Sequence, residues 1–341
     1  MKALKDGQHG YTQGNGILKL RETVAIDIFK RKKVEINPEN IVIVPGGKVT
    51  MWHAILMFGC KGKEIIYPNP GFPIYESVIR YSGAKPIPIK LDISNNFKIN
   101  FEELENSINK NTSMVIINFP SNPTGEIILK EEMNKLVAIL EKYPQVMILS
   151  DEIYSRILYD NINFISLLEY PQLKDRVVIL DGWSKTYAMT GWRIGYGIWP
   201  RKYASIAERL NINSFSCTNT STQFAAIAAL EGPQDCVDKM ILNFDRRRKL
   251  MINELNSING FRCNNSKGAF YLFPSIKATG LSSDEMEDIL LNKLGVAAVS
   301  GTSFGEFGES YIRFSYANSD ENIKLAMEKI KNYFSKKGLE C

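Results

Sequence analysis

Short, continuous runs of apolar residues recur along this chain and alternate with segments of amphipathic pattern. Because the runs are continuous rather than alternating, they are typical of strands that are buried on both faces of a sheet. The runs cover Ile41–Val44, Glu64–Tyr67, Lys85–Ile89, Met114–Phe119, Val146–Ser150, Val177–Asp181 and Ile194–Trp199. Helical patterns such as Lys130–Lys142 lie between several of them. We therefore predict an α/β fold with a mostly parallel seven-stranded sheet sandwiched by helices.

The pattern changes near Asp245, where a helix with many charged residues begins to dominate. The segments expected after it are a stretch at Gly268–Pro274, a helix at Ser283–Leu294, strands at Val296–Ser300 and Tyr311–Tyr316, and a final helix from Ser319. This mixture is typical of a smaller α+β domain. We predict a large domain over residues 1–245 and a small C-terminal domain over residues 246–341.

Composition and charge exclude some classes of protein. The 341 residues carry a formal net charge of only +5, and no lysine-rich tail or basic stripe with aromatic residues indicates a nucleic-acid partner. The densest basic run, Arg246–Lys249, is expected to be the solvated face of a helix. No stretch approaches the roughly 20 apolar residues that a membrane span requires. The first residues also lack the apolar core of a signal peptide.

Cysteine and histidine are too few and too scattered to indicate disulfides or a metal site. The five cysteines include no C-x-x-C pair, so we expect reduced thiols in a cytoplasmic protein. His9 and His53 are the only histidines, which argues against a metal site, and His53 is expected in a helix. The cysteines are Cys60, Cys217, Cys236, Cys263 and Cys341.

The segment Gly182–Gly195 carries the most specific chemistry. Lys185 follows a predicted strand, with Ser184 before it and Arg193 eight residues later. Such an amine suits a Schiff base, while the hydroxyl and the forked guanidinium suit the oxygens of a nearby phosphate. An exposed lysine beside a glycine turn would explain Lys185 alone. The whole segment resembles the pyridoxal-phosphate (PLP) lysine signature of the class I aminotransferases, which implies PLP as the cofactor.

A second glycine-rich turn lies near the start of the predicted sheet. Gly46, Gly47 and Lys48 follow one predicted strand and precede the predicted helix Val49–Phe58. Glycines there let backbone N–H groups approach an anion, and the positive end of the helix dipole favours a phosphate. Because strand-to-helix turns are often glycine-rich, an ordinary turn also fits.

Several polar residues end or follow apolar strands. Asp151 ends one of them, where a carboxylate is costly unless paired. Opposite a pyridine nitrogen it would keep that nitrogen protonated, so that the ring withdraws electrons from the substrate Cα. The alternative is a helix N-cap. Asn122 could start a turn or, together with Tyr154, donate to the phenolic oxygen of the ring.

Two further residues complete the candidate site. Phe72 is a candidate stacking face for the ring, with ordinary core packing as the alternative. Arg313 stands among apolar neighbours in a predicted strand. It suits a bidentate clamp on a substrate carboxylate, and a structural salt bridge is the alternative.

In chain order the motifs resemble fold-type I, class I/II aminotransferases, especially the bacterial aspartate aminotransferase subgroup. They span nearly the whole chain: Tyr11, Gly46–Lys48, Pro70–Phe72, Asn122–Gly125, Asp151–Tyr154, Ser184–Lys185, Gly191–Arg193 and Tyr311–Arg313. The resemblance implies a PLP-dependent transaminase that uses a Lys185 Schiff base to move an amino group from an amino acid to a 2-oxo acid such as 2-oxoglutarate. It also implies a homodimer, in which Tyr11 reaches the phosphate of the partner's PLP.

The resemblance carries the family's functional residues onto this sequence. Catalytic roles are implied for Lys185, Asp151 and Tyr154. Cofactor binding is implied for Gly47, Lys48, Phe72, Asn122, Asp151, Tyr154, Ser184, Lys185, Arg193 and Tyr11. Substrate binding is implied for Arg313, Asn122 and Lys48, and no metal is expected.

The start of the chain departs from the family pattern. Relatives begin several tens of residues earlier, with an arm that packs on the partner and a segment that closes over the substrate. Here Met1 starts just before Gly10. We therefore expect that the chain is a fragment, that its gene start is misplaced, or that the protein lacks the lid.

Substrate and reaction type stay open at this stage. Lys48 occupies the place of a lysine that binds the distal carboxylate in some aspartate-specific relatives, which favours acidic amino acids. Residues Asn213–Thr220 contain no arginine where other aspartate enzymes have one, so aromatic or branched amino acids are alternatives. A PLP-dependent β-elimination lyase would keep the same lysine and aspartate. A non-enzymatic alternative is the sensing domain of a transcription regulator, although no helix-turn-helix module precedes Tyr11.

Overall fold

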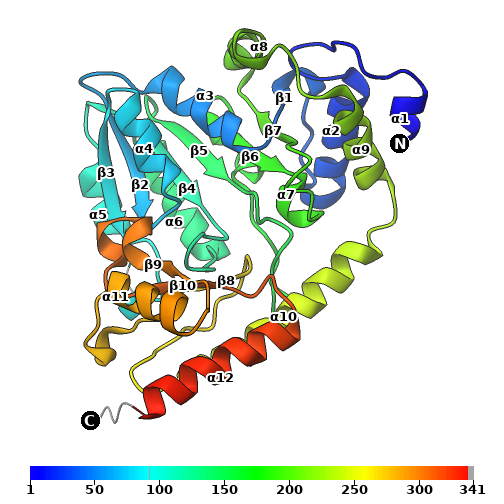
Figure 1. Cartoon of the computed structure of the whole chain (residues 1–341). Coiled ribbons are helices and arrows are strands. Elements are labelled where there is room, and N and C mark those ends of the chain that lie inside the picture. Colours follow the sequence, from blue (N-terminus) through cyan, green and yellow to red (C-terminus); the bar gives the residue numbers. More distant parts are fainter. Residues whose placement is uncertain (92, 337–341) are drawn as a thin grey trace.

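A seven-stranded sheet forms the centre of the molecule, as the computed structural model of residues 1–91 and 93–336 shows (Figure 1). Its strand order is β1-β7-β6-β5-β4-β2-β3. The strands are β1 Ile41–Val44, β2 Glu64–Asn69, β3 Lys85–Lys90, β4 Thr112–Asn118, β5 Met147–Asp151, β6 Val177–Gly182 and β7 Gly195–Ile198. Only β7 runs antiparallel to its neighbours, β1 and β6. The mostly parallel seven-stranded sheet predicted from the apolar runs is confirmed.

Helices cover both faces of this sheet. They are α2 Leu18–Lys32, α3 Lys48–Phe58, α4 Ile74–Tyr81, α5 Phe101–Ser107, α6 Lys130–Glu141, α7 Trp183–Thr186, α8 Arg201–Phe215 and α9 Thr220–Glu231, and the short α1 Lys2–Lys5 precedes them. Alternate residues of each strand enter two different cores, as Ile148 and Leu149 of β5 do. The core that contains Ile148 also holds residues of α2, α5, α6 and α9, and the core that contains Leu149 holds residues of α3, α4 and α8. Strands buried on both faces explain the continuous apolar runs in the sequence.

A smaller sheet and the helices that pack with it form the C-terminal part, which the structure describes as far as residue 336. Its sheet has the order β8-β10-β9, with β8 Tyr271–Leu272, β9 Val299–Ser300 and β10 Ile312–Ser315. The long helix α10 Asp235–Asn256 leads into this part and packs against the last helix, α12 Asp320–Lys336 (Figure 1). The helix predicted at Ser283–Leu294 begins as α11 Ser283–Asp288 and continues as a π-helical turn at Ile289–Lys293. The boundary after residue 245 stays a prediction, and it falls within α10.

The basic run Arg246–Lys249 corrects one expectation from the sequence. Arg248 is not part of a solvated face, because its side chain is only 1% exposed. It pairs with Asp160 at 2.8 Å and with Asp245 at 2.7 Å. Successive helical residues point about 100° apart, so four adjacent basic residues cannot all face water when one side of the helix is packed. Lys249 does lie on the exposed side.

Other sequence expectations concern cysteines, membranes and metals. Cys60, Cys217, Cys236 and Cys263 are free thiols, while Cys341 lies outside the described residues. No helix among residues 1–91 and 93–336 is long and apolar enough to cross a membrane. The same residues include no group of three or more His, Cys, Asp or Glu side chains able to hold a metal ion. His53 lies within α3, as predicted. The cytoplasmic location stays a prediction.

Candidate active site

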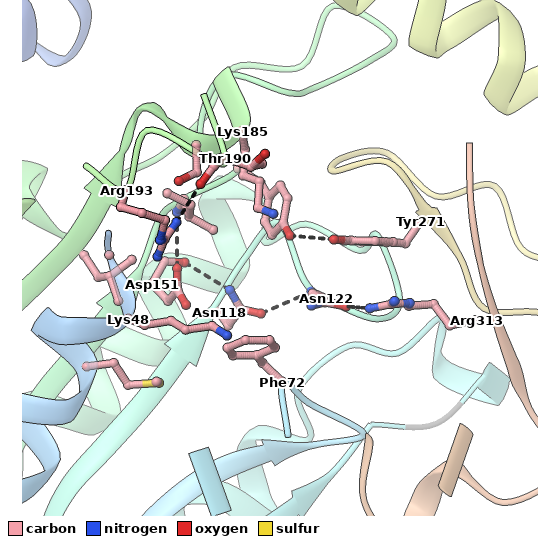
Figure 2. A pocket seen from close by; sticks show the side chains of 16 residues that line it. Lys48, Phe72, Asn118, Asn122, Asp151, Lys185, Thr190, Arg193, Tyr271 and Arg313 are labelled. Carbon is pink, nitrogen blue, oxygen red and sulfur yellow. Dashed lines mark hydrogen bonds between the residues drawn. The ribbon is translucent and has the colours of Figure 1, made fainter. Parts of the chain in front are cut away.

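A cavity of about 470 Å³ opens where the carboxyl ends of β4, β5 and β6 meet residues of the small sheet (Figure 2). Polar ligands bind at this edge of open α/β sheets because the ends of several strands converge there. The lining residues are Gly47, Lys48, Met51, Phe72, Asn118, Asn122, Asp151, Ile153, Tyr154, Leu180, Ser184, Lys185, Thr190, Arg193, Tyr271 and Arg313. Every residue with an implied catalytic, cofactor-binding or substrate-binding role lines this cavity except Tyr11, which is 90% exposed elsewhere.

One end of the cavity combines a helix N-terminus with a guanidinium. Gly47 is the N-cap of α3 and lines this end, so the positive end of the helix dipole lies at the cavity. The N–H groups of Val49 and Thr50 already donate to the carbonyl oxygens of Gly46 and Gly47. Gly46 has φ +92°, and a Cβ at this position would lie 2.1 Å from Nη2 of Arg193. Only glycine therefore allows Arg193 to approach the turn so closely. Nη1 of Arg193 donates to the carbonyl oxygen of Thr190 at 2.8 Å. Ser184 lines the same cavity from α7.

Lys185 lies in the four-residue helix α7, which directly follows β6. Its side chain is half-buried, and its Nζ lies 5.7 Å from the ring centre of Phe270. Burial lowers the pKa of this amine, and the positive charges of Lys48 and Arg313 lower the pKa further. The neutral amine, which is the nucleophilic and basic form, is therefore favoured.

Asp151 is the last residue of β5, and its carboxylate is buried. Tyr75 Oη donates to Oδ2 at 2.7 Å, and the backbone N–H of Ile153 donates to Oδ1 at 3.3 Å. Burial raises the pKa of this carboxyl to about 6, although both hydrogen bonds act in the opposite direction. Residues 152–166 form turns, irregular segments and a β-bridge at Leu158 rather than a helix, so the alternative of a helix N-cap is wrong.

A chain of hydrogen bonds joins Asp151 to Arg313 across the cavity (Figure 2). Asn118 Nδ2 donates to the backbone oxygen of Asp151 at 3.2 Å, and Asn118 Oδ1 accepts from the backbone N–H of Asn122 at 3.1 Å. Asn122 Oδ1 then accepts from Nη1 of Arg313 at 3.0 Å. The two asparagine side chains thus hold the end of β5 at Asp151 in a fixed position relative to the guanidinium of Arg313.

The guanidinium of Arg313 lies between two aromatic rings. Its central carbon is 4.6 Å from the ring centre of Tyr271 and 4.7 Å from that of Phe304. Nε of Arg313 is buried and has no hydrogen-bond partner in the described part of the chain. Among the residues that the structure describes, no carboxylate forms an ion pair with it, and burial lowers its pKa. The alternative of a structural salt bridge therefore does not hold, and the cation is free for an anionic ligand.

Tyr154 and Tyr271 both line the cavity, and their hydroxyl oxygens lie 2.9 Å apart. Both rings are buried, and burial raises the pKa of each hydroxyl, so both stay neutral donors. Sequence reasoning missed Tyr271 because it lies in a two-residue strand with no local motif. It also missed Asn118, which ends an apolar strand just as Asp151 does and could have been found by the same rule.

Comparison with known proteins agrees with this geometry. The profile of the family "Aminotransferase class I and II" matches residues 2–330. A probable aspartate aminotransferase of Methanocaldococcus jannaschii is 37% identical over 98% of this chain and 88% of its own length. An aspartate/prephenate aminotransferase of Nitrosomonas europaea is 36% identical over 98% of this chain and 86% of its own length.

Solved structures give the same result. An aromatic aminotransferase from Pyrococcus horikoshii superposes with a TM-score of 0.96 at 32% identity, covering 99% of this chain and 91% of that one. The aspartate aminotransferase of Rhizobium meliloti superposes with a TM-score of 0.93 at 31% identity, covering 98% and 86%. The chain therefore belongs to the class I and II aminotransferases, PLP-dependent enzymes that transfer an amino group between an amino acid and a 2-oxo acid.

Proposed function

We propose that Lys185 attaches PLP covalently and, once released by the incoming amino acid, moves a proton between the substrate Cα and C4′ of the cofactor. The observation that carries this proposal is that the amine of Lys185 and the carboxylate of Asp151 line the same cavity, at the ends of adjacent strands. When bound, PLP supplies an electron sink that no side chain offers. The lowered pKa of Lys185 supports its role as the base.

The unpaired charges of the cavity fit this cofactor. Asp151 is buried with hydrogen-bond donors and forms no ion pair with any residue among 1–91 and 93–336; a protonated pyridine nitrogen would provide the missing cation. At the other end, Arg193, Ser184 and the N-terminus of α3 suit a phosphate. These two ends lie in one cavity of about 470 Å³, a volume within the usual range of pockets that bind small molecules and cofactors.

The remaining residues would orient the ring and the substrate. Phe72 lines the cavity near the start of α4 and offers a stacking face for the ring. Asn122 and Tyr154 would donate to the phenolic oxygen of the ring. Arg313 would bind the α-carboxylate of the substrate, with its plane held by Tyr271 and Asn122.

We propose an acidic amino acid as the first donor to test, with 2-oxoglutarate as the acceptor. Lys48 supports this choice, because its exposed amine lies 5.2 Å over the ring of Phe72 at the cavity and can meet a second carboxylate. The names of the relatives include both aspartate and aromatic aminotransferases. The aromatic lining, to which Phe72 and Tyr271 contribute, keeps an aromatic donor as the second candidate.

We also propose that the protein is a homodimer in which Tyr11 binds the phosphate in the partner's site. Tyr11 is 90% exposed and does not reach the cavity of its own chain. A hybrid of a Tyr11→Phe chain with a Lys185→Ala chain tests this. If Tyr11 acts across the interface, the hybrid has one intact site, which binds PLP with wild-type affinity. If only weakened sites remain, Tyr11 acts within its own chain.

Replacement of Lys185 by Ala is the direct test of the proposed mechanism. Borohydride reduction followed by mass spectrometry should find PLP attached at Lys185 in the wild type and nowhere in the variant, which should also lose turnover. Lys202→Ala, which removes an exposed lysine from α8, is the matched control and should retain both properties. A variant at Lys185 that keeps the adduct and the activity would refute the assignment.

Amino-donor half-reactions then decide substrate and reaction type. Conversion of bound PLP to its pyridoxamine form should be fastest with acidic donors if Lys48 binds the second carboxylate. Faster conversion by aromatic donors would replace the first candidate by the second. Formation of ammonia and keto acid without any acceptor would instead identify a β-elimination lyase.

A further inference from the structure

Tyr75 is a buried residue behind the cavity that the proposed mechanism has not used. It is the second residue of α4 and is 0% exposed. It does not line the cavity, but its ring packs edge-on against Phe72, with centres 5.8 Å apart and planes at 79°. One side chain therefore contacts both the candidate stacking face and, through its hydroxyl, Asp151.

The hydroxyl of Tyr75 makes the shorter of the two hydrogen bonds received by the Asp151 carboxylate. The distance from Oη to Oδ2 is 2.7 Å, against 3.3 Å from the backbone N–H of Ile153 to Oδ1. A hydroxyl can also rotate, but opposite a carboxylate it must donate. Burial raises the pKa of Tyr75 well above its ordinary value, so it stays protonated and able to donate.

Two consequences follow from this bond. A donor to a carboxylate stabilises the ionised form over the neutral acid, which counteracts the burial of Asp151. The bond also occupies one oxygen and restricts rotation of the carboxyl group, so that Asp151 presents a fixed face to the cavity. Both effects strengthen the binding of a ligand only if that ligand contacts the ionised carboxylate from the cavity.

We propose that Tyr75 is a positioning residue that keeps Asp151 ionised and oriented toward the pyridine nitrogen of PLP. This inference rests on the proposed function, because it assumes that Asp151 faces that nitrogen. If Tyr75 had a purely structural role, loss of its hydroxyl would change the stability of the fold. It would then affect the binding of a ligand equally whether or not that ligand has the pyridine nitrogen.

The test compares PLP with an analogue whose pyridine nitrogen is replaced by carbon, using the full chain freed of cofactor. Dissociation constants for both compounds are measured by equilibrium dialysis for the wild type and for Tyr75→Phe. We expect the variant to bind PLP about tenfold more weakly, in line with loss of a hydrogen bond to a charged group. The analogue should bind equally to both proteins, because it has no nitrogen for Asp151 to contact.

Tyr67→Phe is the matched control. Tyr67 is also buried and donates to a carboxylate, that of Glu76 at 2.8 Å, but it does not line the cavity or contact Asp151. Its PLP affinity should equal that of the wild type. Because the readout is the ratio of two dissociation constants of the same protein, a general loss of structure cannot produce the expected result.

The other outcomes separate two kinds of failure. If Tyr75→Phe binds PLP as the wild type does, or loses the same factor for both compounds, Tyr75 is not a positioning residue. If the wild type itself does not prefer PLP over the analogue, the role of Asp151 in the proposed function is wrong, and the inference on Tyr75 falls with it.

Discussion

Replacement of Asp151 by Asn should stabilise the cofactor-free protein at neutral pH. Asp151 is buried, and its pKa is raised to about 6, mainly by burial. The folded chain thus binds a proton at this site more tightly than the unfolded chain, whose carboxyl has the ordinary value of 3.8. The Asp→Asn change removes the charge and keeps the shape of the side chain, but it turns one acceptor oxygen into an NH2 donor. The Tyr75 hydroxyl, which can rotate, can accept from that NH2 group, while the remaining oxygen still accepts from the N–H of Ile153.

The magnitude follows from the difference between the two pKa values. A group whose pKa is raised on folding lowers the free energy of unfolding as the pH rises from the unfolded to the folded value. From about 3.8 to about 6, this loss amounts to about 3 kcal/mol, and it is fully present above pH 6. The variant avoids this loss. Its advantage should therefore be largest at pH 7 to 8 and vanish near pH 4.

Urea unfolding of both cofactor-free proteins between pH 4 and 8 measures this difference. PLP should reverse the order of stability, because a ligand that binds only the folded state stabilises the protein that binds it more tightly. An advantage of the variant that does not change with pH would show that charge is not its cause. A variant less stable than the wild type at pH 7.5 would refute the argument from burial.

Three further predictions concern other charged residues. Lys48→Gln should shift the pH dependence of PLP attachment to higher pH, because the charge of Lys48 lowers the pKa of Lys185; the rate of adduct formation against pH measures this. Arg313→Lys keeps the charge but loses the planar fork, so KM for the amino donor should rise about 10- to 100-fold, as steady-state kinetics would show. Arg248→Ala should lower the free energy of unfolding by about 2–4 kcal/mol because its buried ion pairs are lost. Lys249→Ala, at an exposed pair, should change it by less than about 1 kcal/mol, and urea unfolding compares the two.

The elements of the large sheet could be predicted because burial on both faces leaves a continuous apolar run. Ile41–Val44 was predicted to the residue, and the other strands to within about two residues. Strand order and the reversed direction of β7 could not be predicted, since an apolar run shows that a strand is buried but not which strands it pairs with or in which direction it runs. The strand expected at Val296–Ser300 shrinks to Val299–Ser300, because only these two residues pair with β10.

The residues of the candidate site also fall into two groups, those that the sequence could predict and those that it could not. Asp151 and Lys185 stand in local motifs next to strand ends, so sequence alone could place them at one edge of the sheet. Tyr75 and Tyr271 escaped notice because their roles depend on contacts with residues 76 and 117 positions away. Such contacts leave no periodic or local signal. Arg248 was misread for the same reason, since its partner Asp160 lies 88 positions earlier.

The electrostatics of the site explain why these residues occur together at a cost to stability. Burial raises the pKa of Asp151 and lowers those of Lys185 and Arg313, so each group is held in an environment that disfavours its own charge. No pair among these three groups forms an ion pair within the described structure, although they line one cavity. Opposite charges that are kept apart can each meet a different part of one ligand. The anion would meet a ring nitrogen, the neutral amine an aldehyde, and the guanidinium a carboxylate. Because the buried charges are not paired with one another, they lower the stability of the cofactor-free protein. The comparison of Asp151→Asn with the wild type measures this loss of stability at one of the three groups.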